Sequence, residues 1–188
     1  MEELIARINA IYPISQGLSE FLDRTLKVQV IPRKGYLLKA GQTSNNIGFI
    51  QRGLLRCFYY QNKNDISSWF MKEGDMVISV ESFFKQTQSF ESIQALEECE
   101  LYYIEYAELQ YMYRNYYESN FIGRVLTENY YTLSEQRVNY MRMTRALEKY
   151  EAFEKSFPDF MQRVPLKHIA TYIGVTVETL SRIRSGTN

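Results

Sequence analysis

The sequence predicts an α+β protein that consists of a β-sandwich, a long helix and a C-terminal group of helices. Residues 27–105 carry short apolar or alternating runs, separated by turn residues about every 8–12 positions, which is typical of sandwiches and barrels. Residues 118–141 repeat apolar side chains at helical spacing. Residues 142–188 contain shorter helical patterns on both sides of Gly174. These three features together predict the fold class.

The composition is that of an ordinary globular protein, but the charge is uneven along the chain. The 188 residues are 45% hydrophobic and 23% charged, with no net charge. Residues 1–141 carry 14 Lys and Arg against 17 Asp and Glu, whereas residues 142–188 carry 8 against 5. We therefore expect only the C-terminal segment to meet a polyanion.

Several classes of protein are excluded by what the sequence lacks. The N-terminal residues have no basic start followed by an apolar run, and no stretch of about 18 apolar residues occurs. Cys57 and Cys99 form no CxxC pair, so they are expected as reduced thiols. We expect a cytoplasmic protein without membrane contact, bound metal or cofactor.

The elements follow in order from the N-terminus. Residues 2–25 predict helical segments interrupted at Pro13, because apolar spacing runs from Leu4 to Ile11 and resumes at Leu18. The turn at residues 62–65 predicts a hairpin tip, since Asn and Asp tolerate positive φ. Strands are expected at 28–31, 36–38, 47–50, 54–60, 67–71, 93–96 and 101–104.

Beyond the strands the sequence predicts helices. The segment 118–141 is one long helix whose apolar residues lie on the sandwich or face the same helix of a second chain. A further helix is expected from Thr144 to Phe157, where Pro158 ends it.

The stretch VPLKHIATYIGVTVETLSRIR has the spacing of a helix-turn-helix. Pro165 suits a first helical position, and Ile169 and Ile173 lie on one face. Gly174 supplies the positive φ that the turn requires. Thr176 is a suitable N-cap for the second helix.

The outer face of that second helix predicts a nucleic-acid interface. Leu180 and Ile183 pack inward, and the opposite face is left to read base edges in the major groove. Arg can pair with guanine, and Glu can accept from cytosine N4. The alternative is a helical hairpin whose polar face only meets water. The residues expected to face the bases of double-stranded DNA are Thr176, Val177, Glu178, Ser181 and Arg182.

Basic and polar residues beside this face are candidates for contacts to DNA phosphates. They are Arg163, Lys167, His168, Thr179 and Arg184. Each basic side chain alone is commonly a solvated charge, but together they form a plausible stripe. His168, the only histidine, is expected at the surface and not as a metal ligand.

Nearly the whole chain resembles the Crp/Fnr superfamily of bacterial transcription regulators. The strand region carries KGYLLKAGQ, FIQRGLLRCFYY and WFMKEGDM, which are similar to the glycine scaffold of the family. TVETLSR is similar to the Fnr-type recognition helix, and residues 162–184 are similar to a large group from the Bacteroidetes. The resemblance implies a double-stranded β-helix (jelly roll) of the cyclic-nucleotide-binding kind. It also implies a homodimer on palindromic DNA with half-sites resembling TTGAT, and contact with RNA polymerase.

The resemblance also implies a division into three parts. Residues 1–117 would form the N-terminal helices and the sensor sandwich, residues 118–141 the dimerisation helix, and residues 142–188 the helix-turn-helix domain. Because the sequence stops at Asn188, we expect this domain to lack most of the β-wing that the family usually adds.

The region that would hold a cyclic phosphate departs from the family pattern. Gly74-Asp75-Met76 resembles its start, but residues 88–92 replace the Arg-Ser/Thr-Ala step, and Glu91 would repel a phosphate. We therefore do not expect cyclic AMP as the effector. Two cysteines also cannot hold the four-Cys cluster of the iron–sulfur branch.

The sandwich is a candidate site for an unknown small-molecule effector. The residues expected to line its pocket are Trp69, Gly74, Asp75, Phe83 and Phe90. The alternative is that the aromatic side chains among them are ordinary core.

Two other functional classes compete with a DNA-binding regulator. One is an effector-binding sensor whose C-terminal helices contact a protein partner instead of DNA. The other is an enzyme on a cupin-like barrel, which requires clusters of His and carboxylate ligands. The single histidine lies outside the strand region, so we do not expect an enzyme or catalytic residues.

Overall fold

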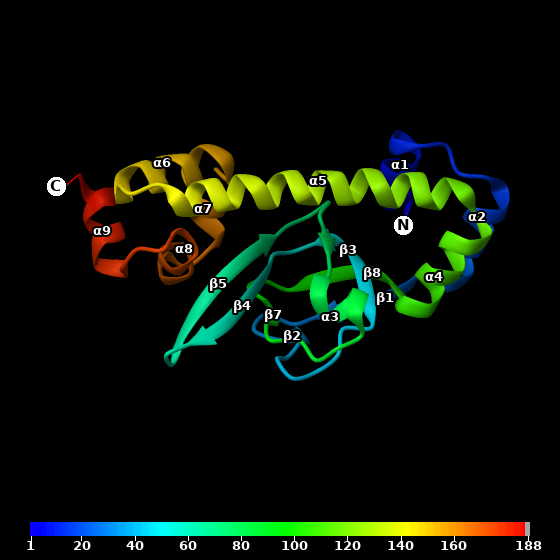
Figure 1. Cartoon of the computed structure of the whole chain (residues 1–188), viewed down its shortest axis with the longest axis horizontal. Helices are drawn as coiled ribbons and strands as arrows, with labels where there is room; N and C mark the ends of the chain where they lie inside the picture. The colour runs from blue at the N-terminus through cyan, green and yellow to red at the C-terminus, as the bar shows by residue number, and fades with distance from the viewer. Residues whose placement is uncertain (187–188) are drawn as a thin grey trace. The chain divides into compact units, whose positions relative to one another are not determined.

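The computed structural model describes residues 1–186, which fall into two compact units. One unit consists of residues 1–57 and 70–129, and the described residues of the other are 58–69 and 130–186. Two adjacent strands and one long helix each contribute to both units (Figure 1). The hairpin at residues 58–69 therefore belongs to the same unit as the C-terminal helices.

The strands form a β-sandwich of two four-stranded sheets, as the sequence predicted. The sheet orders are β1-β8-β3-β6 and β2-β7-β4-β5. Strand β8 lies between β1 and β3 and pairs antiparallel with both, with Lys27 opposite Tyr103 and Ile47 opposite Ile104. The strands are β1 (Lys27–Ile31), β2 (Tyr36–Leu38), β3 (Asn46–Arg52), β4 (Leu55–Gln61), β5 (Asn64–Met71), β6 (Met76–Val77), β7 (Ser92–Ala95) and β8 (Cys99–Glu105).

The hairpin between β4 and β5 turns at Asn62 and Lys63. Their φ angles are 51° and 67°, so both residues adopt the left-handed region. Two successive residues with positive φ match the twist of a tight β-hairpin, and Asn tolerates this conformation well. The predicted hairpin tip is confirmed.

Two N-terminal helices, α1 (Glu2–Ile11) and α2 (Gln16–Thr25), precede the sandwich and are separated near Pro13, as expected. Ser15 caps α2: its hydroxyl oxygen accepts from Leu18 N at 3.2 Å, and the hydroxyl donates to Glu118 Oε1 at 2.5 Å. The short helix α3 (Val80–Lys85) and helix α4 (Tyr106–Asn115) complete this end of the unit. These helices share one apolar core with β8, whose buried residues are Leu18, Leu22, Phe83, Ile104, Leu109 and Met112.

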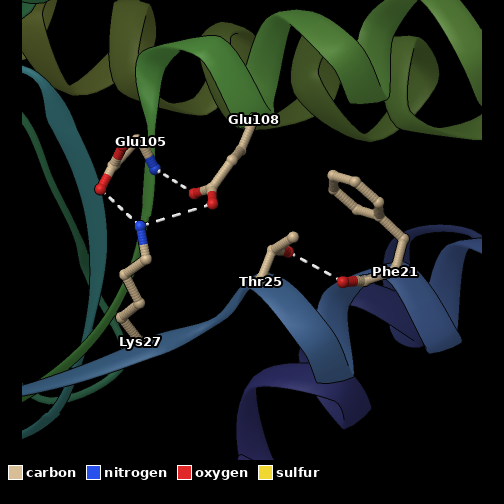
Figure 2. A network of polar contacts seen from close by, with 5 residues as sticks. All are labelled: Phe21, Thr25, Lys27, Glu105 and Glu108. Atoms are coloured by element: carbon tan, nitrogen blue, oxygen red, sulfur yellow. Dashed lines mark hydrogen bonds and ion pairs between the residues drawn. The ribbon is translucent and has the colours of Figure 1, made fainter.

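A polar network joins β1 to the start of α4 (Figure 2). Lys27 forms ion pairs with Glu105 and Glu108, the latter with an Nζ–Oε1 distance of 3.4 Å. Glu105 N donates to Glu108 Oε2 at 2.7 Å, which completes a capping box at α4. Because the lysine is solvent-exposed, the network fixes the direction of α4 more than it adds stability.

The remaining helices follow α4 without further strands among the described residues. Helix α5 (Tyr117–Arg142) covers the long helix predicted for residues 118–141. The next helices are α6 (Ala146–Ser156), α7 (Phe160–Arg163), α8 (Leu166–Ile173) and α9 (Val177–Ser185). Pro165 is the N-cap of α8 and not its first residue, one position from our expectation. The expected lack of a wing concerns chain beyond Gly186 and lies outside the described residues.

Candidate nucleic-acid interface

Helices α8 and α9 form the helix-turn-helix that the sequence predicted. Gly174 ends α8 with φ 72° and ψ 45°, a left-handed conformation that a side chain would strain. Val175 N donates to Ala170 O at 3.0 Å and so closes the turn. The side chain of Thr176 then accepts from Thr179 N at 3.1 Å, which confirms it as the N-cap of α9.

The underside of this motif is apolar and closely packed. Ile169, Ile173 and Leu180 are buried, as their helical spacing predicted. An aromatic cluster extends this core: the ring centroids of Phe153 and Tyr172 lie 5.4 Å apart. The burial of these residues fixes the rotation of α9 about its own axis.

The opposite side of α9 is polar and exposed. Val177, Glu178, Ser181 and Arg182 all face solvent, and Thr176 is exposed at the start of the helix. Hydrogen bonds from the backbone N–H of Glu178 and from the Thr176 hydroxyl lower the pKa of Glu178, and Arg182 four residues later adds to this. The expected base-facing residues therefore lie together on one accessible surface, with an ionised carboxylate beside a guanidinium.

The residues expected to contact phosphates fall into two groups. Lys167 and Arg184 are exposed, and Arg163 and Thr179 are half-buried. His168 is 6% exposed, so its expected position at the surface is wrong. The face of α8 that carries His168 packs inward, so the imidazole is not exposed for a phosphate contact.

The residues expected to line an effector pocket lie in different environments. Phe83 is fully buried in the core formed with α2 and α4, whereas Phe90 is 62% exposed. Gly74 O accepts from Arg7 Nη1 at 3.2 Å, and Asp75 closes the same turn by accepting from Lys72 N. In the other unit, Trp69 packs against Tyr130 with centroids 5.4 Å apart. The burial of Phe83 agrees with the alternative that this ring is ordinary core.

Both cysteines are buried and free, as expected for reduced thiols. Burial raises the pKa of the Cys57 thiol, with the nearby Glu91 carboxylate acting in the same direction. Both effects disfavour the thiolate form of Cys57. Within residues 1–186, no cluster of three or more His, Cys, Asp or Glu side chains is arranged to bind a metal.

One contact of the C-terminal unit was not foreseen from the sequence. Arg137 of α5 donates to the backbone of β5, and Thr171 of α8 bonds to Ser67 of the same strand. The partners are 69 and 104 residues apart in sequence, so no local pattern predicts the contacts. Only the folded backbone brings them together.

Comparison with known proteins identifies the sandwich. Residues 28–116 match the family profile of the cyclic nucleotide-binding domain. A search among curated proteins finds no match to the chain. Of the described residues, none form a helix that is both long and apolar enough to cross a bilayer.

Solved structures extend the likeness beyond this domain. FixK2 from Bradyrhizobium japonicum is 13% identical with a TM-score of 0.73, over 86% of this chain and 83% of that one. A protein from Eubacterium rectale, assigned to the Crp/Fnr family of transcriptional regulators, is 12% identical with a TM-score of 0.74, over 94% and 87%. The c-di-GMP-responsive global regulator CLP from Xanthomonas campestris is 14% identical with a TM-score of 0.68, over 92% and 91%.

The profile match describes the sandwich, and the solved structures describe the fold of the whole chain. The sandwich region is similar in sequence to the cyclic nucleotide-binding domain. The chain as a whole has the fold of these solved structures, one of which is assigned to the Crp/Fnr family of transcriptional regulators. The resemblance read from the sequence is confirmed for the domain and for the fold.

Proposed function

We propose that the protein is a sequence-specific, DNA-binding transcription regulator that acts as a dimer. The observation that carries this proposal is the orientation of α9. Leu180 is fully buried while Glu178, Ser181 and Arg182 project to solvent from the first turns of the helix. A recognition helix requires this arrangement, because its N-terminal residues must reach base edges in the major groove.

The chemistry of this face suits base recognition. Arg182 can donate two hydrogen bonds to the O6 and N7 atoms of guanine, and Glu178 can accept from cytosine N4. Lys167 and Arg184 lie exposed on the two helices of the motif and are our candidates for phosphate contacts, together with the half-buried Arg163 and Thr179. Thr176 and Val177 complete the base-facing set at the start of α9.

The long helix α5 supports the proposal of a dimer. Several large apolar side chains on its second half remain exposed. They are Tyr130, Tyr131, Leu133, Val138 and Met141. A second copy of the helix would cover them and would place two recognition helices about 34 Å apart on palindromic DNA. We propose that such a dimer acts in the cytoplasm and contacts RNA polymerase.

We propose further that the sensor domain does not respond to cyclic AMP. Glu91 lies in the stretch that would hold the cyclic phosphate, and its carboxylate accepts from Ser79 Oγ at 3.0 Å. A negative charge there opposes a phosphate. We expect isothermal titration with cyclic AMP to give no binding heat; saturable binding would contradict this part of the proposal.

A binding titration tests the proposed function. Fluorescence anisotropy at a stated salt concentration would compare a labelled duplex carrying two TTGAT half-sites in palindromic arrangement with a random duplex of equal length. We expect tighter binding to the palindrome, and weaker binding to both as salt rises. Equal affinity for the two duplexes would contradict specific recognition. If the protein bound neither duplex and a protein partner co-purified with it, the alternative function would be favoured, in which the C-terminal helices contact another protein instead of DNA.

A further inference from the structure

The β4–β5 hairpin and the helix-turn-helix are tied together by a set of polar contacts within the C-terminal unit. Five residues make these contacts, and we refer to them as the hairpin clamp: Ser67, Ser68, Arg137, Thr171 and Tyr172. They come from strand β5, helix α5 and helix α8.

The first half of the clamp joins β5 directly to α8. Ser67 N donates to Thr171 Oγ1 at 3.2 Å, and the Thr171 hydroxyl can donate to Ser67 Oγ at 3.1 Å or to His168 O at 3.2 Å. Ser67 is fully buried, so water cannot replace the threonine hydroxyl as the acceptor for its N–H. The hydroxyl thus links strand β5 to α8, the first helix of the helix-turn-helix. We refer to this helix-turn-helix, α8 and α9, as the reading motif.

The second half of the clamp is built on Arg137. Its Nε donates to Ser68 O at 3.0 Å, and its Nη2 lies 3.5 Å from Ser67 O. The guanidinium also stacks on Tyr172, with Cζ 3.5 Å from the ring centroid. One planar side chain therefore holds α5, β5 and α8 at the same time.

Two electrostatic consequences agree with this packing. Desolvation lowers the pKa of Arg137, and burial raises the pKa of Tyr172. Arg137 nevertheless stays charged at any physiological pH, so the clamp is not a pH switch. Its strength depends on geometry, because a guanidinium can stack and donate from two nitrogens in one plane whereas an ammonium cannot.

We propose that the hairpin clamp positions the reading motif for DNA, with Arg137 and Thr171 as its positioning residues. The inference rests on the proposed function. The outer face of α9 is exposed in this arrangement, because of the two motif helices only α8 contributes residues to the clamp. Without it, the reading motif would sample other orientations, and the apparent affinity for DNA would fall with the fraction that stays competent.

Hydrogen exchange on the DNA-free protein tests whether the clamp exists. Thr171→Val removes the hydroxyl at constant shape, and Arg137→Lys keeps the charge but loses the planar stack. We expect faster amide exchange in residues 58–69 and 166–173 for both variants, with helix α2 unchanged. Matched controls are Thr25→Val, which loses only a bond to Phe21 O in α2, and Arg124→Lys, whose guanidinium pairs with the exposed Glu128. Exchange at the parent rate in both clamp variants would overturn the proposal.

Anisotropy with the same variants tests positioning. We expect each clamp variant to bind the palindrome about 5- to 10-fold more weakly, the scale of one lost hydrogen bond, and to lose less affinity for the random duplex. The control variants should bind as the parent does. Unchanged or tighter binding to the palindrome by folded clamp variants would overturn positioning. If the parent protein showed no preference for the palindrome, the proposed function would fall, whereas the exchange result would still decide whether the clamp exists.

Discussion

At the scale of single residues, backbone conformation and side-chain capping define the reading motif. Gly174 has φ 72°, and a Cβ at this position would meet no atom closer than 3.6 Å. The turn therefore needs glycine for its conformation and not for its space. Gly17 is the opposite case: it lies exposed in the first turn of α2 with no positive φ, and a Cβ there would meet Tyr116 Cε1 at 3.4 Å, an ordinary contact, so the main effect of glycine is to add freedom to the unfolded chain.

Replacing these two glycines with alanine should change the free energy of unfolding in opposite directions. We expect Gly174→Ala to lower the free energy of unfolding by about 1–2 kcal/mol, because alanine resists the left-handed region. Gly17→Ala should raise it by about 0.5–1 kcal/mol, because alanine favours helix. Urea denaturation followed by circular dichroism measures both, and destabilisation of equal size in the two variants would contradict the explanation for Gly174.

The sequence predicted much of this residue-level detail, and its errors have a physical cause. Gly174 and Thr176 were foreseen because turns and caps depend on local backbone chemistry. His168 was placed at the surface wrongly, and Phe83 and Phe90 were placed together in a pocket. Their burial depends on which helix face the tertiary structure covers, and polarity or aromatic character alone does not determine it.

At the scale of elements, α9 is held by one cap and one buried face. Thr176 satisfies the N–H of Thr179, and Leu180 fills the space beneath the helix. We expect Thr176→Ala to cost about 1 kcal/mol of stability through the lost cap, whereas Thr176→Ser should keep most of it. Thermal unfolding of the two variants is the measurement, and equal losses would show that the hydroxyl does not cap α9.

The individual strands and helices were easier to predict from the sequence than the contacts between them. Turn residues separate most strands, and helical spacing marks α5, so these elements could be found locally. The two-residue strand β6 and the short helices α3 and α7 were not predicted. The docking of Ser67 to Thr171 joins residues 104 positions apart and follows from topology. The sequence division at residue 117 also gave no sign that residues 58–69 would group with the C-terminal helices.

At the scale of the whole molecule, recognition of palindromic DNA requires a second copy of the chain. Val138 is exposed among the apolar residues of α5, and a charge there would be buried in a dimer without a partner. We expect Val138→Glu to give a monomer in sedimentation velocity and to lose the preference for palindromic DNA. Asn139→Glu, at an exposed position on the other side of the helix, is the matched control and should remain dimeric. A dimeric Val138→Glu protein would show that this face is not the interface.

The central claim is that the outer face of α9 reads DNA bases, and Arg182 tests it most directly. The measurement is the affinity of Arg182→Ala and of the parent for the palindrome and for a set of duplexes, each with one base pair of the half-site changed. We predict that the variant loses about 1–3 kcal/mol on the palindrome and no longer discriminates at a single guanine position. Arg114→Ala, which removes an exposed arginine from α4, should leave the pattern intact. An equal loss on every duplex, or no loss at all, would contradict the claim.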